Sequence, residues 1–167
     1  MRSLKNSYRS VLIIVAAVSA ALAVNHFIFS AVRIVGNSMQ PTLEKNDWVL
    51  VSRLPFEPAY GDIVVFRKKD VSDETIVKRI IGIPGDTVEI KNGVIYINGE
   101  KKENDFSLIS DEYNMEQITV DSDGYFVMGD NRAESNDSRK WADPLVRFEE
   151  IKGKVIVSFF PDIRKLT

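Results

Sequence analysis

The first pattern along the chain is a long uncharged segment behind a basic start. Three cations come first: Arg2, Lys5 and Arg9. No further charged residue occurs before Arg33, so residues 10–32 are uncharged. As a helix they would extend about 34 Å, at about 1.5 Å per residue, enough to cross a hydrocarbon core of about 30 Å. The pattern predicts a single-pass membrane anchor within residues 1–31, with its basic end in the cytoplasm and the rest of the chain exported.

A cleaved secretory signal peptide is the alternative interpretation of the same segment. The basic start, the apolar centre and the small residues of Ala21-Leu22-Ala23 fit that pattern. The apolar run continues, however, through Phe27, Ile28 and Phe29, which favours an uncleaved anchor. Both interpretations export the remaining residues.

Residues 32–167 have the pattern of a β-rich domain. The pair Asn92-Gly93 lies between two apolar runs and predicts a tight hairpin, because both residues tolerate positive φ. Similar turn pairs precede other apolar runs, at Asn46-Asp47, Gly61-Asp62 and Gly85-Asp86. The predicted strands are 32–34, 49–52, 63–67, 76–81, 88–90, 94–97, 125–128 and 154–160, with a short helical turn at 148–151. Short strands joined by Gly and Pro turns predict a mainly β fold, an antiparallel coiled or barrel-like sheet.

Residues 101–123 depart from this pattern. They contain seven acidic side chains: Glu103, Asp105, Asp111, Glu112, Glu116, Asp121 and Asp123. Only Lys101 and Lys102 balance them. We interpret this segment as a solvated excursion from the β domain.

The amino-acid composition excludes several classes of function and of active site. The chain has 167 residues and a net charge of -2, which suits one exported domain and lacks the basic face that nucleic-acid binding requires. There is no cysteine, which excludes disulfides, cysteine nucleophiles and thiolate metal sites. The single histidine, His26, lies near the outer end of the predicted anchor, which favours an interfacial role over a place in a Ser-His-Asp triad.

Ser38 lies in a predicted turn directly after a strand. Gly36 precedes it, and Pro41 follows it and interrupts regular strand pairing. A hydroxyl at a strand end, with backbone N–H groups nearby, suits a nucleophile that needs oxyanion donors. Ordinary turn chemistry accounts for the same residues, so Ser38 is a candidate only.

Lys78 is the second candidate, because it lies between two isoleucines on a predicted strand. Side chains alternate along a strand, so Ile76, Lys78 and Ile80 share one face. Burial on that face would lower the pKa of the lysine and supply the neutral amine that accepts a proton from a serine. A lysine that extends its amine into water is the alternative.

The third candidate is the loop 129–139, which follows the predicted strand 125–128. It is dense in hydrogen-bonding groups and poor in apolar ones. This composition fits three kinds of loop: one that orients a buried amine, one that binds a cation, and an ordinary polar loop. Catalysis by two aspartates that share a proton, as in aspartic proteases, is a further alternative, although the sequence singles out no pair.

These three segments, in this order behind an N-terminal anchor, resemble the type I signal peptidases, the bacterial leader peptidases of peptidase family S26. The similarity rests on Ser-Met-x-Pro-Thr at 38–42, the Gly-Asp strand at 61–66, Lys-Arg-x-x-Gly-x-Pro-Gly-Asp at 78–86, and Gly-Asp-Asn-Arg with Ser-x-Asp-Ser-Arg at 129–139. The length and the single anchor are similar to the compact members typical of Gram-positive bacteria.

The resemblance implies a role for each matching residue. Ser38 matches the nucleophile, Lys78 the general base, and Ser135 the serine that orients the lysine amine. Two ion pairs are expected to support the site: Arg79 with Asp130, and Asp137 with Arg139. The Ser38 N–H matches one oxyanion donor. Gram-negative members carry a serine as second donor where this chain has Gly36, so here that donor has to be another group or a water.

The resemblance further implies a membrane-bound, monomeric serine endopeptidase without metal or cofactor that removes signal peptides from exported preproteins after Ala-x-Ala sites. Ser38 follows Arg33 by at most about 18 Å of extended chain, so the nucleophile should lie near the outer membrane face. An extended substrate would pair as an additional strand. Four residues are candidates for the walls of its apolar pockets: Met39, Ile34, Ile76 and Val77.

Two other functions fit parts of the sequence. A self-cleaving Ser-Lys domain like that of LexA-type repressors is similar in its catalytic fold, but the anchor and the absence of a DNA-binding domain argue against it. An inactive, membrane-tethered binding module of the same family is the second. The presence of both Ser38 and Lys78 argues against an inactive module.

Overall fold

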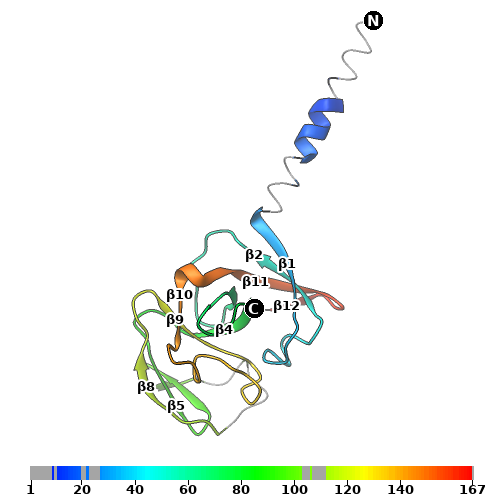
Figure 1. Ribbon diagram of the computed structural model, residues 1–167. Helices are drawn as coiled ribbons and strands as arrows, with labels where there is room; N and C mark the ends of the chain where they lie inside the picture. Colours follow the sequence, from blue (N-terminus) through cyan, green and yellow to red (C-terminus); the bar gives the residue numbers. More distant parts are fainter. Residues whose placement is uncertain are drawn as a thin grey trace, which may run out of the picture.

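The computed structural model describes residues 9, 11–19, 22, 27–102, 106 and 112–166 (Figure 1). Residues 11–19 are helical and expose large apolar side chains, among them Val11, Ile13 and Ile14. Within the described ranges, no helix combines the length and the apolar character that crossing a membrane requires. Arg2, Lys5 and His26, which the sequence assigns to the anchor, lie outside the described residues.

The described β domain consists of two sheets. The larger contains β1 (Phe29–Arg33), β2 (Trp48–Ser52), β3 (Ile63–Phe66), β4 (Ile76–Gly82), β9 (Gly124–Met128), β10 (Leu145–Arg147), β11 (Ile151–Phe160) and β12 (Arg164–Lys165). The smaller contains β5 (Thr87–Lys91), β6 (Val94–Ile97), β7 (Glu100–Lys101) and β8 (Met115–Thr119). A single 3-10 turn, η1 (Phe148–Glu150), precedes β11, as the sequence predicts for 148–151.

The strand order brings distant parts of the chain together. In the larger sheet the order is β1-β2-β11-β3-β4-β9-β10, with β12 paired to β11, and in the smaller it is β7-β6-β5-β8. Every pairing between the described strands is antiparallel. The predicted mainly β, antiparallel architecture is therefore confirmed. β11 lies between β2 and β3, so it joins the strands next to Ser38 to the strand pair that carries Lys78.

Turn chemistry accounts for the predicted hairpin and for one more. Asn92 and Gly93 have φ values of 49° and 76°, and β5 pairs with β6 across them, which confirms the hairpin prediction. Asn98 and Gly99 have φ values of 55° and 79° and turn the chain from β6 into β7. The second pair has the same sequence signature as the first, so this turn too was predictable from the sequence.

Strand β8 was not predicted from the sequence. It lies within residues 101–123, the segment interpreted as a solvated excursion, and it pairs with β5. Met115 and Ile118 of β8 pack against the core between the smaller sheet and β9. This part of the acidic segment is therefore a strand of the smaller sheet, and its one acidic residue, Glu116, is exposed.

Strand β4 contributes to three hydrophobic clusters. Ile76 and Ile80 pack with Phe66 in one cluster, Val77 packs against a second, and Ile81 belongs to a third. β4 is therefore fixed on both faces, and Lys78, its third residue, is held between packed neighbours.

Candidate active site

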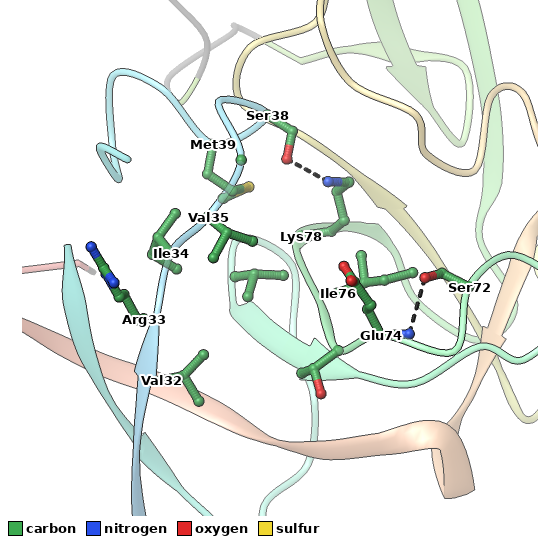
Figure 2. Close-up of a pocket in the computed structure, with 13 residues that line it drawn as sticks. Val32, Arg33, Ile34, Val35, Ser38, Met39, Ser72, Glu74, Ile76 and Lys78 are labelled. Atoms are coloured by element: carbon green, nitrogen blue, oxygen red, sulfur yellow. Dashed lines mark hydrogen bonds between the residues drawn. The ribbon is translucent and has the colours of Figure 1, made fainter. Parts of the chain in front are cut away.

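Ser38 is held in a turn between β1 and β2. The Ile34 N–H donates to the Asp47 carbonyl oxygen (2.8 Å) at the base of the turn, and the Leu43 N–H donates to the Met39 carbonyl oxygen (2.9 Å) on its far side. The side chains of Met39 and Leu43 are buried in the core. Because residues on both sides of Ser38 are anchored, its hydroxyl has a defined direction, toward Lys78 (Figure 2).

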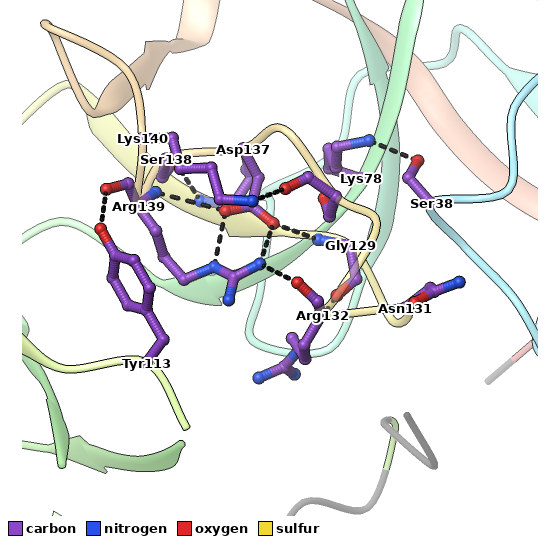
Figure 3. Close-up of polar contacts among 12 residues, drawn as sticks. Ser38, Lys78, Tyr113, Gly129, Asn131, Arg132, Asp137, Ser138, Arg139 and Lys140 are labelled. Carbon is purple, nitrogen blue, oxygen red and sulfur yellow. Dashed lines mark hydrogen bonds and ion pairs between the residues drawn. The ribbon is translucent and has the colours of Figure 1, made fainter. Parts of the chain in front are cut away.

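The side chain of Lys78, on β4, points toward Ser38. Its Nζ lies 2.6 Å from Ser38 Oγ, within hydrogen-bonding distance (Figures 2 and 3). The residue is only 4% exposed, and its neighbours on the same strand face, Ile76 and Ile80, pack into one cluster. The alternation of side chains along β4 and the burial of Lys78 are thus as the sequence predicts.

Burial changes the acidity of this lysine. Loss of hydration lowers the pKa of Lys78 to about 8, whereas the charges of Asp137 and Asp130 act in the opposite direction and Arg139 reinforces the decrease. A substantial fraction of the amine is therefore neutral near pH 8. A neutral amine next to a hydroxyl is the arrangement that general-base catalysis requires.

A buried ion pair lies behind Lys78. Arg139 Nε donates to Asp137 Oδ1 at 2.8 Å, and both side chains are fully buried. Burial disfavours the charged carboxyl of Asp137, but Arg139 and the Gly129 N–H hold its pKa below the ordinary value. Tyr113 covers the guanidinium of Arg139 with its ring and donates from its hydroxyl to the Arg139 carbonyl oxygen (2.7 Å) (Figure 3).

The second expected ion pair is also present. Arg79 donates to Asp130 through Nε (2.9 Å) and Nη2 (2.7 Å), and the two side chains are buried. Thr42 donates from its hydroxyl to the same carboxylate at 2.6 Å. Asp130 therefore joins the turn that carries Ser38 to the strand that carries Lys78. Sequence reasoning did not identify Thr42, although it lies in the Ser-Met-x-Pro-Thr segment.

The loop 129–139 contacts the backbone of Ser38 directly. The Asn131 N–H donates to the Ser38 carbonyl oxygen at 3.0 Å. At Gly129, a Cβ atom would lie 2.3 Å from that same oxygen and 2.4 Å from Ser135 Oγ. Only a residue without a Cβ fits there. Sequence reasoning gave Gly129 no role, and its one signal is a glycine placed directly after a buried strand.

Ser135 is buried next to this contact. Its carbonyl oxygen accepts from Lys140 Nζ at 2.8 Å. Its hydroxyl lies close enough to the Asp137 carboxylate to help lower the pKa of that group, and among the described residues it makes no hydrogen bond to Lys78. The hydrogen bond to the Lys78 amine that the resemblance implies is therefore not formed in this state of the site.

The position of the expected second oxyanion donor is open. A Cβ on Gly36 would meet no atom within 4 Å. As far as the chain is described, the Ser38 N–H donates to no other backbone group. One donor is thus available beside Ser38 Oγ, and no side chain extends from position 36 to supply another.

A groove of about 170 Å³ runs from Ser38 and Lys78 along the inner side of β1 and β4. The four expected wall residues all line it: Ile34, Met39, Ile76 and Val77. Polar residues line its far end, where Glu74 and Ser72 lie opposite Val32 (Figure 2). The described residues contain no group of three or more side chains that would hold a metal ion.

Comparison with known proteins identifies relatives of this chain. The family model described as "Signal peptidase, peptidase S26" matches residues 7–160. "Signal peptidase I S" of Bacillus subtilis (strain 168) is 39% identical over 164 residues, which cover 89% of this chain and 86% of that protein. "Probable signal peptidase I-2" of Synechocystis is 34% identical over 155 residues, which cover 88% and 70% of the two chains.

A solved structure agrees with these relatives. The crystal structure of a signal peptidase I from Enterococcus faecalis V583 superimposes with a TM-score of 0.50 and 30% identity, covering 59% of this chain and 97% of that one. The sequence similarity thus covers nearly the whole chain, and the structural similarity covers 59% of it. This chain belongs to the signal peptidase family, peptidase S26.

Proposed function

We propose that this chain is a membrane-tethered serine endopeptidase that uses a Ser38–Lys78 dyad to remove signal peptides from exported preproteins, cleaving after Ala-x-Ala sites. The observation that carries the proposal is the 2.6 Å contact between Lys78 Nζ and Ser38 Oγ, made by a lysine whose pKa burial lowers to about 8. A lysine with its ordinary pKa of 10.5 would remain protonated at neutral pH and accept no proton.

The reaction follows from these groups. Neutral Lys78 accepts the Ser38 proton as Oγ attacks the scissile carbonyl, and the Ser38 N–H donates to the oxyanion. The protonated amine then gives its proton to the leaving amino group as the C–N bond breaks, which leaves an acyl-enzyme. Lys78 next accepts a proton from the attacking water and returns it to Ser38 as the acyl group leaves.

Three neighbouring features support the dyad. Ser135 Oγ, which is buried and makes no hydrogen bond to Lys78 among the described residues, can accept from the Lys78 amine once Ser38 Oγ becomes acylated. In the buried pair of Asp137 and Arg139, the negative and the positive charge next to Lys78 offset each other. The Asp130 carboxylate joins the turn of Ser38 to β4. We assign positioning roles to these residues, because catalysis loses about 10²-fold for a displacement of about 1 Å.

The groove suits an extended substrate with small side chains near the cleaved bond. β1 is an edge strand of the larger sheet, so the segment after it offers backbone groups to a strand-like peptide. Ile34, Met39, Ile76 and Val77 give the groove apolar walls, which suit apolar side chains such as alanine next to the cleaved bond.

We further propose that the segment before β1 tethers the enzyme, with the N-terminus in the cytoplasm and the catalytic domain outside. Residues 29–31, which the sequence pattern assigned to the anchor, belong to β1 instead and pair with β2. The support is the uncharged run at 10–32 behind three cations, together with the exposed apolar side chains of the 11–19 helix. A tether at this position would hold Ser38 close to the membrane, where signal peptides are themselves anchored.

The test uses the full-length chain in lipid with a labelled preprotein that carries an Ala-x-Ala site. We expect cleavage after the second alanine by the parent chain and a loss of at least about 10³-fold in Ser38→Ala and in Lys78→Met. Thr167→Ala, at the end of the chain, is the matched control. Cleavage that survives in Lys78→Met would point to another base, His26 first. Absence of cleavage by every form would indicate the inactive binding module instead.

A further inference from the structure

A second cavity adjoins the groove on the side where β1 begins. Its volume is about 440 Å³, and it shares Val32 and Thr75 with the groove. Valines form its floor: Val32, Val51 and Val65. Cations surround this floor: Arg53, Arg67 and Lys152. The cavity is therefore amphipathic, apolar below and positively charged around its opening.

The sheet topology gathers the three cations at one end. β2 ends at Ser52, and the next residue, Arg53, donates from its N–H to the Ile28 carbonyl oxygen at 2.7 Å. β3 ends just before Arg67, and β11 begins next to it, because Ile151 pairs with Phe66. Arg53 is thus hydrogen-bonded to Ile28, the residue directly before β1.

None of these cations is neutralised within the described part of the chain. Arg53 and Arg67 make no ion pair there, and Lys152 Nζ donates only to the Glu149 carbonyl oxygen (3.0 Å). No acidic side chain lines the cavity. Asp70, Glu149 and Glu150 line a separate hollow that also includes Arg67 and Lys152, and Glu74 lines the adjoining groove. Three unpaired cations around one opening repel each other and attract an anion.

We propose that this cavity binds the headgroup phosphate of an anionic membrane lipid. The inference rests on the proposed membrane tether, which brings the end of the sheet at Arg53 to the depth of the lipid headgroups. The phosphate contacts the three cations, and the valine floor contacts the glycerol and the first acyl carbons. A lipid bound there lies beside Val32 and Thr75, so it also closes the membrane side of the substrate groove.

The test measures lipid binding to the full-length chain in micelles of an uncharged detergent by native mass spectrometry. The probes are phosphatidylglycerol, phosphatidylcholine and inorganic phosphate. The parent chain is compared with the triple variant Arg53→Gln/Arg67→Gln/Lys152→Gln. The matched control, Lys45→Gln/Lys91→Gln/Lys101→Gln, changes the net charge equally but away from the cavity. Each neutralised cation near a lipid phosphate is expected to weaken binding about five-fold, so the triple variant loses about 100-fold and the control changes less than about two-fold.

Three results would overturn the proposal: equal affinity of the triple variant and the parent, equal binding of phosphatidylcholine, or displacement of phosphatidylglycerol by an equal concentration of phosphate. If the triple variant does not fold, Arg53→Gln alone should show the five-fold loss. Preprotein cleavage by the parent is measured in the same samples. Lipid binding without cleavage would contradict the peptidase function and leave the lipid site standing, whereas cleavage with no lipid preference would contradict the lipid site alone.

Discussion

Gly129 approaches the Ser38 carbonyl oxygen so closely that a Cβ on Gly129 would lie 2.3 Å from it. We expect Gly129→Ala to push the Ser38 turn or the loop 129–139 away and to lower kcat for preprotein cleavage by about 10²-fold or more. The measurement is single-turnover cleavage, with thermal unfolding to establish that the variant is folded. Parent-like kcat in Gly129→Ala would mean that the two segments separate without affecting the dyad.

The pH dependence of cleavage should follow Lys78. Because only the neutral amine accepts the Ser38 proton, kcat/KM should fall about ten-fold per pH unit below the Lys78 pKa of about 8. A profile of kcat/KM from pH 5 to pH 10 measures this acid limb. A limb centred near pH 6 would instead indicate a histidine.

The same pKa shift predicts how stability changes with pH. The folded-state pKa of Lys78 is lowered from 10.5 to about 8, so between these values the unfolded chain binds more protons than the folded one. The free energy of unfolding attributable to Lys78 should therefore rise with pH from about 8 to 10.5 and stay constant below that range. Denaturant titrations of the parent and of Lys78→Met measure this contribution. The difference between their free energies of unfolding should change with pH only between about 8 and 10.5.

Position 36 offers a chance to add a catalytic group. A side chain there meets no atom within 4 Å, so Gly36→Ser should be accommodated and its hydroxyl should donate to the oxyanion. We expect kcat to rise, by at most the about 10²-fold that a pre-organised donor contributes in other enzymes. Gly36→Ala, which adds the Cβ without the hydroxyl, is the control. Equal kcat in the serine and alanine variants would show that position 36 lies outside reach of the oxyanion.

Asp137→Asn should affect both stability and acidity. It leaves Arg139 buried beside a neutral partner, which should lower the free energy of unfolding by about 3 to 5 kcal/mol. It also removes a negative charge that raises the Lys78 pKa, so the acid limb of the rate profile should move to lower pH. Asp123→Asn, at the exposed pair with Arg147, should cost less than about 1 kcal/mol and leave the limb in place. A shift of the acid limb to higher pH would contradict the conclusion that the charge of Asp137 raises the pKa of Lys78.

Local sequence chemistry was sufficient for much of the fold. Asn92-Gly93 predicted its hairpin because the turn depends only on the backbone preferences of two adjacent residues. The alternation Ile76, Lys78, Ile80 predicted a buried lysine because strand geometry fixes which side chains share a face. β8 was missed because its acidic neighbours dominate the composition, whereas its core contacts depend on only Met115 and Ile118.

The site depends on contacts that no local pattern encodes. The resemblance paired Arg79 with Asp130, but the bond from Thr42 to the same carboxylate follows from the tertiary fold alone. Likewise, nothing near Gly129 in sequence shows that Ser38, some ninety residues earlier, occupies the space a side chain would need. The burial of Ser135 next to Gly129 follows from the same packing.

The position of β11 between β2 and β3 has a consequence for when the enzyme acquires activity. β1 and β2 flank the turn that carries Ser38, β3 and β4 carry Lys78, and the strand that joins these halves is formed by residues 151–160. During synthesis the serine and the lysine are made early, yet the sheet between them closes only when β11 has left the ribosome. In a chain that stops before residue 151, only the contacts of Asp130 and Asn131 would hold the Ser38 turn against β4, so we expect its Ser38–Lys78 contact to form less stably than in the full chain.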